Sequence, residues 1–148
     1  MSDSSPTHVL IVANRTAATR ALLDATHARA SEGPCSFTLL VPQFGGEGQS
    51  GEDEARKTLE LAIPLLEEAA GGPVAGLIGP DDALLAVERA LVREHFDEVI
   101  ISTLPERVSH WLKRDLPTKV ERLGIPVTVV RAEATQQPVD APTLFAGP

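Results

Sequence analysis

Aromatic residues and cysteine are scarce in this sequence. Only 3% of its 148 residues are aromatic, tyrosine is missing, and Cys35 is the single cysteine. An intrachain disulfide is therefore excluded, and because Cys35 opens an apolar segment we expect its thiol to be buried. Hydrophobic residues still make up 43% of the chain, so we expect a globular domain with a core of alanine, leucine, valine and isoleucine.

Long apolar runs and basic residues are also few. No segment approaches the roughly 18 apolar residues that a membrane helix requires. The opening MSDSSPTHVL lacks the features of a secretory signal, so a cytoplasmic location is expected. Thirteen basic residues against 21 acidic ones give a net charge of −8, which disfavours nucleic acid or an anionic membrane as a partner.

Recognisable catalytic and metal-binding motifs are missing as well. The four histidines are scattered, with no second ligand at metal-binding spacing: His8, His27, His95 and His110. Neither a Gly-x-Ser-x-Gly nor a P-loop motif occurs. We therefore predict no metal site, and we expect a binding or regulatory module rather than an enzyme.

Five short apolar segments alternate with helical periodicity. The strands are predicted at residues 8–13, 36–41, 74–78, 98–102 and 127–131. The helices are predicted at residues 16–30, 52–70, 82–95 and 104–123, with a break at residues 116–117 and a kink at Pro64. This order predicts one doubly wound α/β domain over residues 1–132, with a five-stranded parallel sheet and helices on both faces. Residues 133–148 form a predicted Pro-rich tail.

Polar residues follow several of these strands. In open α/β sheets, ligands bind at the carboxyl ends of the strands, where the strand order reverses. Short polar loops also close any strand–helix unit, so the pattern alone leaves a purely structural role open. The candidate ligand-binding residues are Asn14, Arg15, Thr16, Val41, Pro42, Gly79, Ser102, Thr103 and Arg107.

The segment after the fourth strand contains two helix starts. Thr103 and Glu106 have the spacing of a capping box. Asp115, two residues before Pro117, is predicted to cap a second helix. Trp111, between these two starts, is predicted to be a packing or interface anchor rather than a surface on which a base stacks.

The order of these motifs resembles the universal stress protein family. The resemblance covers residues 8–131 and rests on Asn14-Arg15-Thr16, on Gly79-Pro80-Asp81, on the strand exit IIST and on the closing KVERLGIPVTVV. It implies the strand order 3-2-1-4-5 and ATP binding in many members. It also implies a homodimer through the fifth strand, which here is Val127–Arg131. An apolar edge strand at this position favours the same pairing.

The ATP-binding pattern of that family is not retained. The family has an acidic residue after the first strand, where this chain has Asn14, and a phosphate loop G-x2-G-x9-G-[ST]. The glycine positions are occupied by Ile101, Leu104 and Arg114, and the hydroxyl position by Asp115. Side chains there would block the approach of phosphate to the backbone, and an aspartate cap would occupy the amides.

The resemblance therefore predicts a binding or regulatory module with a degenerate nucleotide pocket that does not bind ATP in the usual mode. Two alternatives stay open. Arg107 and Lys113 could replace the glycine loop in a weak nucleotide-binding or nucleotide-hydrolysing protein. The chain could also be a protein-interaction module with no small ligand. No cofactor is certain, and a nucleotide or another small anion is the candidate ligand.

Overall fold

A computed structural model describes residues 6–44, 49–104 and 110–132. The five strands are β1 (Thr7–Val12), β2 (Cys35–Pro42), β3 (Val74–Gly79), β4 (Glu98–Thr103) and β5 (Val127–Arg131). The helices are α1 (Arg20–Ser31), α2 (Gln49–Ala70), α3 (Ala83–Arg93), α4 (His110–Lys113) and α5 (Leu116–Glu121). The tail predicted for residues 133–148 lies outside the described residues.

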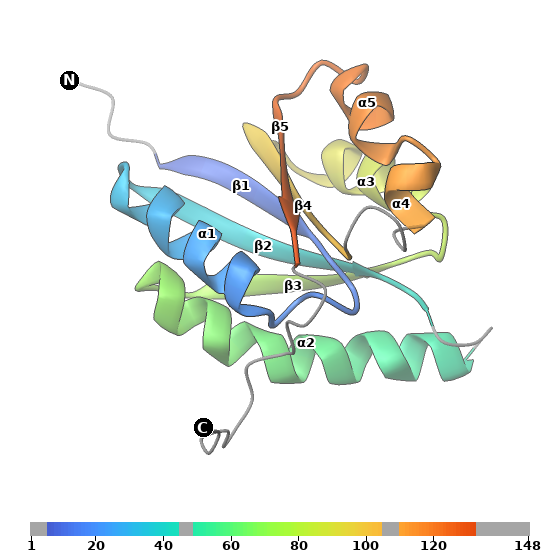
Figure 1. Ribbon diagram of the computed structural model, residues 1–148, viewed down its shortest axis with the longest axis horizontal. Helices are drawn as coiled ribbons and strands as arrows, with labels where there is room; N and C mark the ends of the chain where they lie inside the picture. Colours follow the sequence, from blue (N-terminus) through green and yellow to red (C-terminus); the bar gives the residue numbers. More distant parts are fainter. Residues whose placement is uncertain (1–5, 45–48, 105–109, 133–148) are drawn as a thin grey trace.

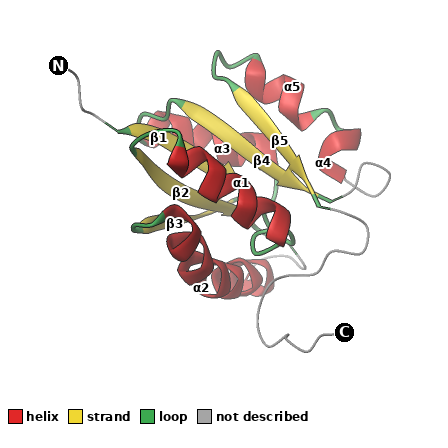
Figure 2. Cartoon of the chain, turned by 60° about the vertical axis from the view of Figure 1, so that its left-hand side comes forward, coloured by secondary structure: helices red, strands yellow, loops and turns green. Residues whose placement is uncertain are grey.

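All the strands pair in parallel, in the order β3-β2-β1-β4-β5. The predicted doubly wound sheet and its order are confirmed. Helices α1 and α2 cover one face of the sheet, and α3, α4 and α5 cover the other (Figures 1 and 2). Strand β1 lies between β2 and β4, so the order of the strands along the chain reverses there.

The core consists of one apolar layer on each face of the sheet. Val9 and Ile11 of β1 pack in the layer below α1 and α2, whereas Leu10 and Val12 pack in the layer below α3 and α5. All four side chains are completely buried. A strand buried on both faces must be apolar at every position, which is why the segment shows a continuous run rather than an alternation.

Helix α1 begins later than predicted. Its first residue is Arg20 rather than Thr16, and Thr19 is the N-cap, with its Oγ1 accepting a hydrogen bond of 3.4 Å from the backbone N–H of Leu22. Before the helix, the backbone N–H of Ala17 donates to the carbonyl of Asn14 over 3.2 Å. The residues after β1 therefore form a turn, which holds Thr16 beside the sheet instead of on a helix.

Helix α2 begins three residues before its predicted start and continues through Pro64 as one element. Helix α3 begins and ends within its predicted range, and the Oδ1 atom of its N-cap, Asp82, accepts a hydrogen bond of 3.2 Å from the backbone N–H of Leu85. The predicted periodicity therefore locates both helices, and the differences are confined to their ends.

The predicted last helix is divided at Asp115 rather than at residues 116–117. Asp115 has a φ of 61° in the left-handed region, which aspartate tolerates better than most residues. It is the N-cap of α5, but its side chain makes no capping hydrogen bond. The expectation that its carboxylate occupies the helix amides is therefore wrong. Glu106 of the predicted capping box lies outside the described residues.

The amino-terminal end of the sheet is closed by an ion pair. The Nε atom of Arg29 on α1 lies 2.8 Å from Oε2 of Glu98, and a second nitrogen of the guanidinium lies 3.1 Å from Oε1. The thiol of Cys35 donates to the carbonyl of Arg29 over 3.8 Å. Cys35 is only half-buried, contrary to the expectation, because it lies at this exposed end of β2; its partial burial still raises the pKa of the thiol.

Gly79 at the end of β3 allows α3 to pack closely on the sheet. A Cβ atom at this position would lie 2.6 Å from Cβ of Ala86 and 3.2 Å from Cδ1 of Leu40. Because Ala86 belongs to the helix itself, its Cβ cannot move aside as the end of a long side chain can. Only glycine fits at this position without displacing the helix.

We therefore expect Gly79→Ala to lower the free energy of unfolding by about 1–3 kcal/mol, as overpacking does. The matched control is Gly72→Ala, where an added Cβ meets no atom within 4 Å, and its effect should stay below about 1 kcal/mol. Urea denaturation of both variants measures the difference. Equal stabilities would mean that α3 is not held in place by this contact.

Candidate functional site

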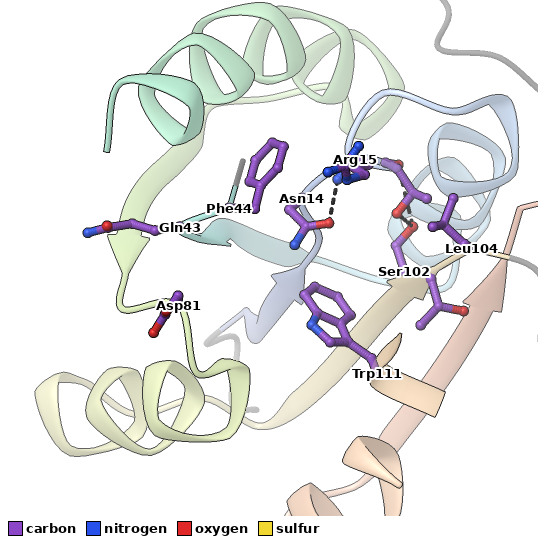
Figure 3. A pocket seen from close by; sticks show the side chains of 10 residues that line it. Asn14, Arg15, Gln43, Phe44, Asp81, Ser102, Leu104 and Trp111 are labelled. Atoms are coloured by element: carbon purple, nitrogen blue, oxygen red, sulfur yellow. Dashed lines mark hydrogen bonds between the residues drawn. The ribbon is translucent and has the colours of Figure 1, made fainter. Parts of the chain in front are cut away.

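A cavity of about 350 Å³ opens at the carboxyl ends of the strands, where the strand order reverses (Figure 3). Asn14, Arg15 and Thr16 line it from the turn after β1, and Ser102, Thr103 and Leu104 line it from the end of β4. Gln43 and Phe44 follow β2, Asp81 follows β3, and Trp111 belongs to α4. This is the position that the topology predicts for a ligand.

A buried pair of hydroxyl groups joins the two central strand exits. The Oγ1 atom of Thr16 lies 2.6 Å from Oγ of Ser102, and both side chains are buried. The hydroxyl of Thr19 donates to the carbonyl of Thr16 over 3.1 Å. Because a buried hydroxyl needs a partner, this pair holds the turn after β1 against β4 and makes this wall of the cavity rigid.

Asn14 directs an amide group toward the cavity. Its Oδ1 atom accepts a hydrogen bond from the backbone N–H of Arg15, so its Nδ2 group is the end that remains for a ligand. Figure 3 shows Asn14 between Phe44 and Trp111. The guanidinium of Arg15 lies 5.5 Å from the centre of the Phe44 ring, within cation–π distance.

Thr103 contributes an unsatisfied polar atom. Its Oγ1 is buried and has no hydrogen-bond partner among the described residues, although the residue lines the cavity. Buried hydroxyls without a partner are rare in folded proteins and call for an explanation. The residue lines the cavity, but this oxygen itself has almost no exposed surface, so it is not directed into the open space.

Trp111 has two roles. It packs against the apolar layer between the sheet and α3 and α5, which agrees with the predicted packing role. It also forms part of the cavity wall, where it offers an aromatic surface to a ligand. Trp111 therefore packs as predicted, and its half-buried ring also lines the cavity.

Five of the predicted site residues line the cavity together: Asn14, Arg15, Thr16, Ser102 and Thr103. Three others do not. Val41 is in the core and Pro42 is buried in β2, because this strand extends one residue further than predicted. Gly79 belongs to β3 and faces α3. Arg107 lies outside the described residues.

The prediction missed Gln43, Phe44, Leu104 and Trp111, and named Asp81 only as part of its loop. The position of Gln43 and Phe44 directly after an apolar strand was the available signal. Leu104 lines the cavity where the family resemblance places a glycine. Arg114 does not line this cavity and therefore does not block it, although the resemblance placed it at another glycine position.

The described part of the chain contains no group of three or more histidine, cysteine or acidic side chains placed to hold a metal ion. Among the same residues, no helix has both the length and the apolar character that crossing a membrane requires.

A parallel sheet of this order, with a cavity at the reversal, defines a class of doubly wound α/β domains that bind ligands at this point. No family model and no curated protein matches the sequence. Solved structures do match the fold. A universal stress protein from Archaeoglobus fulgidus superposes with a TM-score of 0.55 at 17% identity, covering 84% of this chain and 93% of that one.

Two further matches contain nucleotides. A universal stress protein family protein from Arabidopsis thaliana with AMP bound has a TM-score of 0.61 at 15% identity, covering 87% of this chain and 94% of its own. A universal stress protein in complex with cAMP has a TM-score of 0.60 at 16% identity, covering 88% of this chain and 100% of its own. The chain therefore has the universal stress protein fold.

We expect the hydrogen bond between the hydroxyls of Thr16 and Ser102 to stabilise the folded protein measurably. Ser102→Ala leaves the buried Oγ1 of Thr16 without this partner and should lower the free energy of unfolding by about 1–3 kcal/mol. The matched control is Ser31→Ala, which removes an exposed hydroxyl that donates to the carbonyl of His27 and should change stability by less than about 0.5 kcal/mol.

A double-mutant cycle identifies the partner. Thr16→Val combined with Ser102→Ala should cost less than the sum of the two single changes, because the second change removes the group that the first leaves unpaired. Urea denaturation of the four proteins gives the coupling. Additive costs would show that the two hydroxyls do not stabilise each other.

Proposed function

We propose that this protein is a universal stress protein family member that acts as a binding or regulatory module for an adenine mononucleotide, and that it is not an enzyme. The observation that carries the proposal is the cavity at the reversal of strand order, lined by Asn14, Thr103 and Trp111. Its volume of about 350 Å³ lies in the range of small-molecule sites, about 300–1,000 Å³. Proteins with this fold contain AMP and cAMP.

The lining groups suit a nucleoside. Trp111 and Phe44 present aromatic surfaces to a base, and the Nδ2 group of Asn14 can donate to a ring nitrogen. Thr103 supplies a hydroxyl that has no partner among the described residues, and Asp81 supplies a carboxylate that can accept from ribose hydroxyls. Each of these groups recognises a ligand without attacking it.

The degenerate phosphate loop supports a ligand shorter than ATP. Leu104 lines the cavity in place of a family glycine, so its side chain occupies space through which a phosphate would reach the backbone. The described lining residues include no histidine, cysteine or lysine that could act as a base or nucleophile. Recognition of one nucleotide, without chemistry on it, is the function we assign to this arrangement.

Titration of AMP and ATP tests the proposal. Trp111 is the only tryptophan and lines the cavity, so its fluorescence should change as AMP binds, and ATP should bind no more tightly than AMP. Asn14→Ala should weaken AMP binding about five- to tenfold, the effect of one lost hydrogen bond.

A second test uses Thr103→Val, which changes a threonine that lines the cavity. Its matched control is Thr128→Val, which changes an exposed threonine on β5. Only the first should weaken AMP binding. The proposal fails if AMP does not bind at millimolar concentration, or if both threonine variants bind AMP equally well.

For assembly, we propose a homodimer through β5. This strand lies at the edge of the sheet, where its outer backbone groups have no strand partner among the described residues. Val127 and Val130 pack on opposite faces of the sheet, and Val129 is only half-buried. Such an edge can pair with a second copy of itself.

Val129→Lys should convert the dimer to a monomer, because a charge would have to be buried at the new interface. The matched control is Val92→Lys, which changes a valine on α3 that is 88% exposed in the single chain and should leave the dimer intact. Size-exclusion chromatography with light scattering at tens of micromolar protein reads the outcome. A wild-type monomer, or a dimer unaffected by Val129→Lys, contradicts the interface.

A further inference from the structure

A second cavity, of about 370 Å³, lies beside the first. Both cavities are lined by Asp81 and Trp111, which therefore form the boundary between them. The second cavity extends between the start of α3 and the pair α4 and α5, which lie on the same face of the sheet (Figures 1 and 2). A ligand that passes Asp81 and Trp111 would occupy both.

The charges of the second cavity favour an anion. Asp82 accepts the hydrogen bond that caps α3 and faces the positive end of that helix, so its charge is partly compensated. Arg114 and Lys119 also line this cavity, and among the described residues neither side chain takes part in an ion pair or a hydrogen bond. The cavity therefore has two cationic side chains that no ion pair neutralises among the described residues. Asp81 is its one carboxylate that does not cap a helix.

We propose that the second cavity binds the phosphate of a nucleotide whose nucleoside occupies the first, with Arg114 and Lys119 as its ligands. This inference rests on the proposed function and specifies its anion site. Asp81 fits the boundary because a carboxylate accepts hydrogen bonds from ribose hydroxyls. The ribose is the part of a nucleotide that joins base to phosphate, so it belongs where the two cavities meet.

In this proposal the phosphate is bound by side-chain cations instead of by the backbone amides of a glycine loop. Leu104 occupies the first cavity where the family pattern has a glycine, whereas Arg114, at another glycine position, turns toward the second cavity. Arginine binds phosphate through a planar fork of donors, and lysine binds it as a point charge. Arg114, one of the residues that replace the phosphate-loop glycines, thus contributes to the second site.

Arg15 is the competing cation. It lines the first cavity, and its guanidinium is placed over the ring of Phe44. A phosphate held by Arg15 would stay in the first cavity and would not need Arg114 or Lys119. The test therefore compares the two sets of cations directly.

The experiment measures the affinities of adenosine and AMP by calorimetry. In the wild-type protein AMP should bind about tenfold more tightly than adenosine, the sum of two modest ionic contacts, and this advantage should shrink as salt is added. Arg114→Gln combined with Lys119→Gln should abolish the advantage and leave the affinity for adenosine unchanged. The control, Arg89→Gln with Arg122→Gln, makes the same change of charge outside both cavities and should retain the advantage.

Three outcomes overturn the inference while leaving the proposed function standing. They are an AMP affinity equal to that of adenosine in the wild type, an advantage that survives the Arg114 and Lys119 changes, and an advantage abolished by Arg15→Gln alone. Failure of both adenosine and AMP to bind rejects the proposed function together with the inference. Inorganic phosphate should compete with AMP but not with adenosine; if it binds without competing with AMP, the second cavity holds a separate anion and the inference is wrong.

Discussion

The structure depends on the burial of β1 from both sides. Its neighbours are β2 and β4, and its side chains alternate between two closed apolar layers. Connections between parallel strands are right-handed. Helices α1 and α2, which connect β1 to β2 and β2 to β3, therefore cover one face of the sheet. Helices α3, α4 and α5, which connect strands in the opposite direction across the sheet, cover the other face. The chain leaves β1 and β4 toward different faces, and the space left between the two exits is the cavity.

Most of this arrangement could be predicted from the residues, because a strand covered on both faces must be apolar throughout. The apolar segments therefore located the strands to within one or two residues. Two local features could not be predicted. Helix α1 begins at Arg20 because the hydroxyl of Thr16 pairs with Ser102, a residue 86 positions away. Asp115 is the N-cap of α5 as predicted, but its left-handed φ was not foreseen, and no capping hydrogen bond of its own side chain accounts for it.

The candidate site shows how a small error in a strand boundary changes the residues assigned to it. The turn after β1 and the end of β4 were predicted correctly, because polar residues follow those apolar runs directly. Strand β2 continues through Pro42, so the next two residues, Gln43 and Phe44, reach the cavity instead. Trp111 could not be assigned to the cavity from the sequence, because its half-buried position depends on the packing of α4 against the sheet.

The pairing of β1 with β4 also has a consequence for synthesis of the chain. Val9 pairs with Glu98, so one edge of the central strand has no partner until β4 has been made. The last of the first three strands, β3, ends at Gly79, and β4 begins 19 positions later, at Glu98. At translation rates of about 5–20 residues per second, the nascent chain spends roughly 1–4 seconds in this interval. During that time the central strand has an unpaired edge, and edges of this kind make a partly synthesised chain prone to aggregation.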